Sequence, residues 1–182
     1  MRPCSPPRRI LGPARLPVST AQVKARLRLG GIADHDEEVD RLLTAAVDLL
    51  DGYRGLLGYA LEAQTWEVEF GALAGVLELP LGPVSSVVSI TWRDDAGAPH
   101  VLAPEEYALD IATGSVVPVE GWPDLGHAAM AASRPTVRWV AGTGCGPAET
   151  AAIEALVLHW FDGGVGLPPG LLDQLPRRAL AV

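Results

Sequence analysis

The sequence predicts an α+β fold, in which helices from near both ends of the chain form a bundle and an antiparallel β-sheet with a hairpin is inserted between them. A change of period supports this class. Apolar residues recur every three or four positions in residues 34–58 and 147–162, whereas they alternate singly in strand-like segments between residues 63 and 141. The 182 residues can bury one good core. The expected parts are an N-terminal arm (1–18), a central domain (19–162) and a C-terminal tail (163–182).

Two helices are predicted before the sheet. The first covers residues 20–29, because Ser19 or Thr20 can accept a hydrogen bond from the free amides of its first turn. The second covers residues 34–58 and begins at Asp34, followed by acids that the helix dipole favours. Its apolar face comprises Val39, Leu42, Ala46, Leu49, Tyr53 and Leu56.

The middle of the chain predicts half-buried strands. Trp66, Val68 and Phe70 alternate with polar residues, and similar alternation occurs near residues 77–81, 88–92 and 136–141. The segment 79–84 reads LPLGPV. Its prolines remove backbone donors and its glycine permits a bend, so we expect the chain to leave one strand and start the next at a fixed angle. This geometry aims the hairpin whose turn lies at residues 94–97.

The last predicted helix, residues 147–162, begins with Pro147 and is apolar on more than one side. A helix of this kind is buried more deeply than a surface helix. The tail beyond Pro168 is also apolar but too short to be stable alone. Two alternatives remain open: the tail folds back on its own core, or a partner chain covers it.

Charge is distributed unevenly along the chain. The net charge is −8, yet four arginines and no acid lie in the first fifteen residues. An acidic body repels nucleic-acid phosphate, which argues against sequence-specific DNA binding. The basic, proline-rich arm either docks on an acidic surface, touches DNA loosely or is a solvated tail.

Composition restricts the class further. Only Cys4 and Cys145 are present, so a disulfide framework is not expected. No apolar run approaches the roughly 18 residues that span a bilayer, and we expect no membrane association. The N-terminal segment lacks the apolar centre of a signal peptide, so we expect synthesis in the cytoplasm.

Two segments could carry ligand chemistry. The acids and histidine at residues 34–40 invite a metal hypothesis, but they lack the calcium-loop pattern and are better explained by helix-start electrostatics. The loop at residues 142–146, GTGCG, lies between a strand and a helix, which is the context of a phosphate-binding loop. It has no Lys-Ser/Thr ending and no nearby base. A small nucleotide- or metal-binding enzyme that uses this loop stays as an alternative.

Cys145 in the same loop is a weak candidate nucleophile. A helix N-terminus can lower the pKa of a thiol, but a catalytic thiol also needs a base. None of the four histidines has a matching partner motif. We therefore expect no catalytic residues, no cofactor and no metal.

Several motifs together resemble a known family. In chain order they are PVSTAQVKARLRL, an acid-started helix, QTWEVEF, LPLGPVSSVVSITWRDDAG, EEYALD, GWP, VRWVAGTG and PAETAAIEALVLHWF. The chain resembles the head-tail connector (adaptor) proteins of long-tailed phages and gene transfer agents, over about residues 17–161.

The resemblance implies a structural protein of the particle neck that is made in the host cytoplasm. Its copies would form a ring, expected to contain twelve subunits, between the portal protein and the stopper or head-completion protein. DNA would pass through this ring without sequence-specific binding. The runner-up within this structural class is another tail-junction protein such as a stopper.

The resemblance also suggests contact residues. In that family the C-terminal segment faces the portal, although here a glycine-rich stretch, residues 162–166, stands where relatives often carry charges. The expected portal-binding residues are Leu171, Leu172, Leu175, Arg177 and Arg178. The expected contacts between subunits or rings involve the hairpin and the end of the last helix, namely Trp92, Asp94, Asp95, Gly97, Trp160 and Phe161. An acidic lumen is a further hypothesis, because it would not hold passing DNA.

Overall fold

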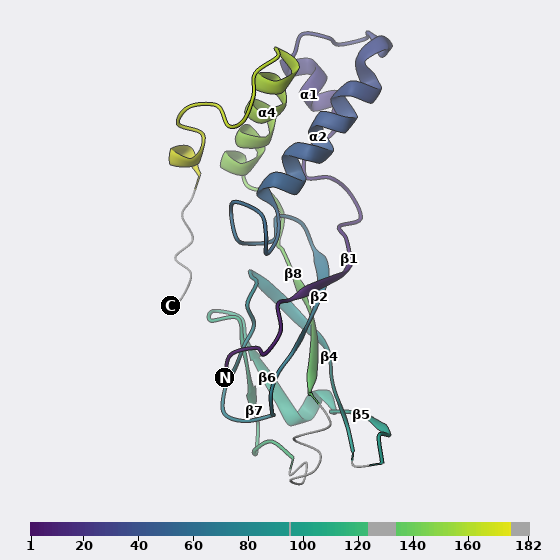
Figure 1. The fold of residues 1–182 in the computed structure, drawn as a ribbon, viewed down its shortest axis with the longest axis vertical. Coiled ribbons are helices and arrows are strands. Elements are labelled where there is room, and N and C mark those ends of the chain that lie inside the picture. Colours follow the sequence, from purple (N-terminus) through teal and green to yellow (C-terminus); the bar gives the residue numbers. More distant parts are fainter. Residues whose placement is uncertain (95, 124–133, 176–182) are drawn as a thin grey trace. The chain divides into compact units, whose positions relative to one another are not determined.

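The computed structural model describes residues 1–94, 96–123 and 134–175 of the chain (Figure 1). The chain divides into two compact units. Unit 1 comprises residues 1–14 and 63–143 and contains antiparallel sheets; unit 2 comprises residues 15–62 and 144–182 and contains α-helices. The predicted α+β class is confirmed, with the sheets formed largely by the inserted middle of the sequence.

Unit 1 contains two antiparallel sheets in the part of the chain that the structure describes. The larger has the strand order β1-β2-β8-β4-β5, and the smaller has the order β3-β7-β6. A 3-10 turn, η2 (Pro104–Glu106), leads into β6. The strands are β1 (Arg8–Leu11), β2 (Gln64–Glu69), β3 (Leu77–Glu78), β4 (Val84–Arg93), β5 (Pro99–Val101), β6 (Tyr107–Asp110), β7 (Ser115–Pro118) and β8 (Thr136–Ala141).

The N-terminal segment is part of the larger sheet. Strand β1 pairs antiparallel with β2, with Arg8 opposite Glu67, and Cys4 N–H donates to the Glu69 carbonyl at 2.9 Å. Arg8 Nη2 also lies 2.7 Å from Glu67 Oε1. The solvated-tail alternative is therefore wrong for residues 4–11, because a partner about sixty residues away in sequence fixes this strand.

The LPLGPV segment turns the chain into β4, as its prolines and glycine predict. Trp139 is fully buried, and its Nε1–H donates to the Leu81 carbonyl at 3.0 Å. Gly142 N–H donates to the Pro83 carbonyl at 2.8 Å. Strand β8 and the residue that follows it thus hold both sides of the bend.

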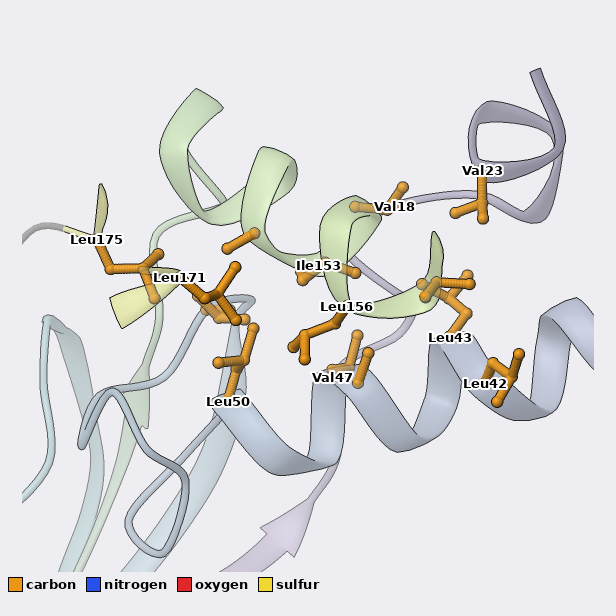
Figure 2. Packing of buried hydrophobic residues seen from close by; sticks show 14 of the residues in the cluster. Val18, Val23, Leu42, Leu43, Val47, Leu50, Ile153, Leu156, Leu171 and Leu175 are labelled. Carbon is orange, nitrogen blue, oxygen red and sulfur yellow. The ribbon is translucent and has the colours of Figure 1, made fainter. Parts of the chain in front are cut away.

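The elements of unit 2 pack around an apolar core (Figure 2). Leu43, Val47 and Leu50 project from α2 toward Ile153 and Leu156 of α4. Ser19 and Gln22 form a capping box at the start of α1. The helical elements are α1 (Thr20–Arg26), η1 (Ala33–His35), α2 (Asp36–Leu50), α4 (Pro147–Phe161) and η3 (Leu172–Gln174).

Helix α2 ends at Leu50, so the predicted helix over residues 34–58 is too long. Asp51 has an extended backbone, and its Oδ1 accepts the Leu61 N–H at 2.7 Å. Gly52 has a φ of 81° and donates its N–H to the Tyr59 carbonyl at 2.9 Å. A buried carboxylate and a left-handed glycine therefore close a compact loop where the apolar pattern alone predicts more helix.

The first part of the C-terminal tail folds back on unit 2. Leu171 and Leu175 are buried in its core beside α2 and α4 (Figure 2). Leu172 is exposed. The fold-back alternative is thus the one observed for residues 171–175. Among the described residues, no helix has the length and apolar character needed to cross a lipid bilayer.

The loop after α2 predicts a sharp substitution effect. A Cβ at Gly55 would overlap the carbonyl oxygens of Leu50 and Asp51, which are backbone atoms and cannot move aside cheaply. Gly55→Ala should lower the free energy of unfolding by about 1–3 kcal/mol, as overpacking does. Urea denaturation would measure the loss. Gly30→Ala is the matched control, because nothing lies within 4 Å of its new Cβ; equal stability of both variants would contradict the prediction.

Candidate interaction surfaces

Three backbone N–H groups of the glycine loop between β8 and α4, those of Gly142, Gly144 and Cys145, donate hydrogen bonds inside the protein. Gly144 N–H donates to the Leu61 carbonyl at 3.0 Å, and Cys145 N–H donates to Glu62 Oε1 at 3.3 Å. With Gly142 bonded to Pro83, the loop does not present the row of free amides that cradles a phosphate.

A carboxylate occupies the start of α4. Glu149 lies in the first turn, is buried, and accepts the Tyr59 hydroxyl at 2.7 Å on Oε1. A Cβ at Gly146 would lie only 2.7 Å from its Oε2. Because this negative group sits where an anion would bind, the geometry argues against the nucleotide-binding alternative.

Cys145 is not activated. Burial raises the pKa of its thiol to about 11, and the nearby carboxylates of Glu149, Glu62 and Asp51 act in the same direction. The neutral thiol is a poor nucleophile at neutral pH. The observed site is therefore a structural turn, and the acids that hold it also suppress thiol reactivity.

The acidic start of α2 is divided among separate partners. Lys24 forms an ion pair with Asp36, Thr20 hydrogen-bonds to Asp40, and His35 Nδ1 lies 3.8 Å from Glu38 Oε2. Within the described ranges, no group of three or more histidine, cysteine or acidic side chains could hold a metal ion. These acidic residues thus form pairs with side chains of α1 and of η1.

The tip of the β4–β5 hairpin is organised by Asp94. Its Oδ1 accepts the N–H groups of Ala96 and Ala98 at 2.9 Å each, and its Oδ2 accepts His100 Nε2–H at 2.8 Å. The His100 hydrogen bond is the main cause that lowers the pKa of Asp94. Trp92 stacks on His100 with ring centroids 4.5 Å apart.

The structure thus brings together three of the predicted contact residues, Trp92, Asp94 and Gly97, at one exposed tip. Gly97 has a φ of 81° and its carbonyl accepts Arg93 Nη1–H at 2.9 Å. Asp95 lies outside the described residues. Side-chain hydrogen bonds therefore fix the conformation of the tip.

The end of α4 presents a second surface. Trp160 Nε1–H donates to the Gly166 carbonyl at 2.7 Å, and Phe161 meets His35 edge-on at 5.5 Å. Both predicted contact residues are therefore half-buried in their own unit. The loop that Trp160 holds exposes Val165, which is 92% accessible.

Val165 was not among the predicted contact residues. Its signal is an apolar residue between glycines, and its exposure depends on a loop that sequence patterns do not reveal. Gly164 N–H donates to the His159 carbonyl at 2.8 Å, and a Cβ at Gly164 would overlap the His159 ring. The glycine allows the loop to lie against α4.

The predicted portal-binding residues separate into three groups. Leu171 and Leu175 are core residues, and Leu172 is exposed beside them. Arg177 and Arg178 lie outside the described residues. Of the three leucines, only Leu172 offers a large exposed side chain to another protein.

The fold is similar to that of chains in solved particle necks. No family model and no curated protein matches the sequence. A chain of "Neck of empty GTA particle computed with C6 symmetry" matches with a TM-score of 0.71 and 20% identity, covering 98% of this chain and 99% of that one. A chain of "Virion of native gene transfer agent (GTA) particle" matches with a TM-score of 0.70 and 19% identity, covering 97% and 98%.

A third solved chain extends the same likeness. It belongs to "Neck of native GTA particle computed with C12 symmetry" and matches with a TM-score of 0.62 and 20% identity, covering 95% of this chain and 98% of that one. At this level of identity the comparisons show a shared fold over essentially the whole length of both chains.

The raised pKa of Cys145 predicts low reactivity. Iodoacetamide should alkylate Cys145 at pH 8 at least about tenfold more slowly in the folded protein than in urea, because less thiolate is present. Peptide mass spectrometry would follow Cys145 and the exposed Cys4 in the same sample. Equal rates for Cys145 with and without urea would contradict the burial argument.

The hairpin geometry predicts unequal effects of two substitutions at Asp94. Asp94→Ala should release the tip because it removes both acceptor oxygens, whereas Asp94→Asn keeps one acceptor for the Ala96 and Ala98 amides. The amide chemical shifts of these alanines would report the change. If both variants kept native shifts, Asp94 would not be the organiser of the tip.

Proposed function

We propose that this protein is a structural adaptor subunit in the neck of a phage-like or gene transfer agent particle, and that it catalyses no reaction. The observation that carries the proposal is the fold shared with neck-particle chains over 98% of this chain and 99% of the other. The internal hydrogen bonds of the glycine loop and the neutral thiol of Cys145 are consistent with a non-catalytic role.

Assembly into a ring is the second part of the proposal. Two of the similar chains belong to necks treated with C6 and C12 symmetry, so a dodecamer is the expected ring. Unit 2 leaves large apolar side chains exposed after its core is complete. Those in α4 and in the described segment that follows it are Leu158, Val165, Leu167 and Leu172. Surfaces of this kind are typical of protein contacts, and neighbouring copies or rings would cover them.

The C-terminal segment is the proposed portal contact. Leu171 and Leu175 anchor η3 in the core, which presents Leu172 outward and leads to Arg177 and Arg178. In this proposal Leu171 and Leu175 position the segment, and Leu172, Arg177 and Arg178 touch the portal. The stopper or head-completion protein would meet another face, and DNA would cross the lumen without sequence-specific contacts.

The shaped hairpin tip is proposed to touch a neighbouring subunit or the next ring. Trp92, Asp94, Asp95 and Gly97 belong to this contact, together with Trp160 and Phe161 at the end of α4. A preorganised tip loses less conformational entropy on binding than a mobile loop, which favours its use in assembly.

Direct portal binding tests the adaptor role. Mixing the full chain with the purified portal of its particle should give a ring stacked on the portal in electron micrographs. Leu172→Asp should weaken this association at least about tenfold, because it places a charge in a desolvated contact. Val88→Asp on β4 is the control, since Val88 is similarly exposed but lies far along the chain from the C-terminal segment.

The outcomes separate the adaptor from its runner-up. A stopper would not bind the portal directly, so absence of any complex with the wild-type chain would overturn the adaptor proposal. Normal binding by Leu172→Asp would overturn only the assignment of the portal contact.

A further inference from the structure

Strand β6 and the turn before it form an acidic edge. Glu105 and Glu106 lie in η2, Asp110 ends β6, and no basic residue occurs between residues 104 and 110. No ion pair within the described ranges links these three carboxylates to a base. Glu106 Oε2 instead accepts the Ala103 N–H at 2.7 Å, and Asp110 Oδ1 accepts the Ala112 N–H at 3.0 Å.

The backbone of this edge is also open. In the described part of unit 1, β6 is an end strand that pairs only with β7. Val119 N–H donates to the Glu106 carbonyl at 3.0 Å, which sets the alternation of the antiparallel ladder. By this alternation Tyr107 and Leu109 direct their N–H and C=O groups away from β7. An unpaired edge of this kind can accept another chain.

Strand β1, at the end of the other sheet, carries the opposite charge. Arg8 is 74% exposed and shares Glu67 with Arg138, whose Nε donates to Glu67 Oε2 at 3.0 Å. Two guanidinium groups thus face one carboxylate, which leaves an excess positive charge at the surface. Arg2, near the start of the same segment, is also exposed, and its Nε lies 3.9 Å from Glu78 Oε2.

Both edges are flanked by exposed apolar side chains. Ile10 and Leu11 continue β1, and Leu11 is 66% exposed. Ile111 follows β6, and Val119 lies beside its first residues. Charge therefore sets the orientation of a contact between the two edges, while the apolar side chains supply area that gains from burial.

We propose that the acidic β6 edge of one copy docks on the basic β1 edge of the next copy. The inference rests on the ring of the proposed function and names the contact between neighbours. Because the two surfaces differ, the contact is heterologous, and its repetition closes a ring when the rotation between copies fits. The basic N-terminal segment thus serves as one half of the contact between neighbouring subunits.

Two charge-reversed variants of the full chain test this assignment. Glu105→Lys with Glu106→Lys makes both edges basic, and Arg2→Glu with Arg8→Glu makes both edges acidic. Each variant alone should need at least about tenfold more protein for half-assembly, because like charges then meet at every contact. An equimolar mixture should assemble as wild type does, since each edge meets its complement in an alternating ring. Glu37→Lys with Asp48→Lys on α2 is the matched control for reversed surface charge.

Ring formation is measured by sedimentation and electron microscopy, with the portal present, and thermal melts check that every variant is folded. Two folded variants that each assemble as well as wild type would overturn the contact. So would a mixture that assembles no better than its components. If the wild-type chain forms no ring, both the proposed function and the proposed contact are wrong. If the wild-type chain forms rings and the charge-reversed variants form them equally well, only the proposed contact is wrong.

Discussion

Unit 2 depends on the burial of α4, a helix without a continuous polar face. Ile153 and Leu156 pack against α2, and Glu154 Oε2 lies 2.9 Å from Arg26 Nε of α1. The C-terminal segment adds Leu171 and Leu175 to the same core. One helix therefore contacts elements on several sides, whereas Leu158 near its end and Val165 in the loop that follows it remain exposed.

The start of the same helix explains why the glycine loop forms a turn that is poorly suited to bind an anion. Glu149 binds the Tyr59 hydroxyl, and Asp51 binds the Leu61 amide, so each buried carboxylate has a partner. A buried polar group without such a partner would cost stability. Burial is the main cause that raises the pKa of Cys145, and these carboxylates act in the same direction. The negative charge of Glu149 also disfavours anion binding at the start of α4. The same carboxylates therefore contribute both to local stability and to the low reactivity expected of the Cys145 thiol.

The sequence predicted the parts of the fold that depend on local patterns. The start of α1 follows from its capping box, and the bend before β4 follows from its prolines and glycine. Periodicity places the end of α2 too late, because it does not reveal the hydrogen bond from the Leu61 N–H to the Asp51 carboxylate. Local patterns predict an arm where strand β1 forms, because the residue that pairs with Arg8, Glu67, is distant in the sequence. At the candidate surfaces, the hairpin position was predictable, whereas the burial of Leu171 and Leu175 and the exposure of Val165 arise only from packing.

The ion pairs on the larger sheet bear on what the N-terminal segment contributes. Glu67 is largely buried beneath Arg8 and Arg138, and these guanidinium groups help to lower its pKa even though its burial acts in the opposite direction. Arg138 reaches only Oε2, through two of its nitrogens, and Arg8 Nη2 is the partner of Oε1 at 2.7 Å. Arg8 therefore completes the hydrogen bonding of a largely buried carboxylate, while 74% of its own side chain stays accessible at the edge of β1. In the proposed contact, a charge that the fold already holds in place is well suited to orient a neighbouring copy, because its geometry is set before the contact forms.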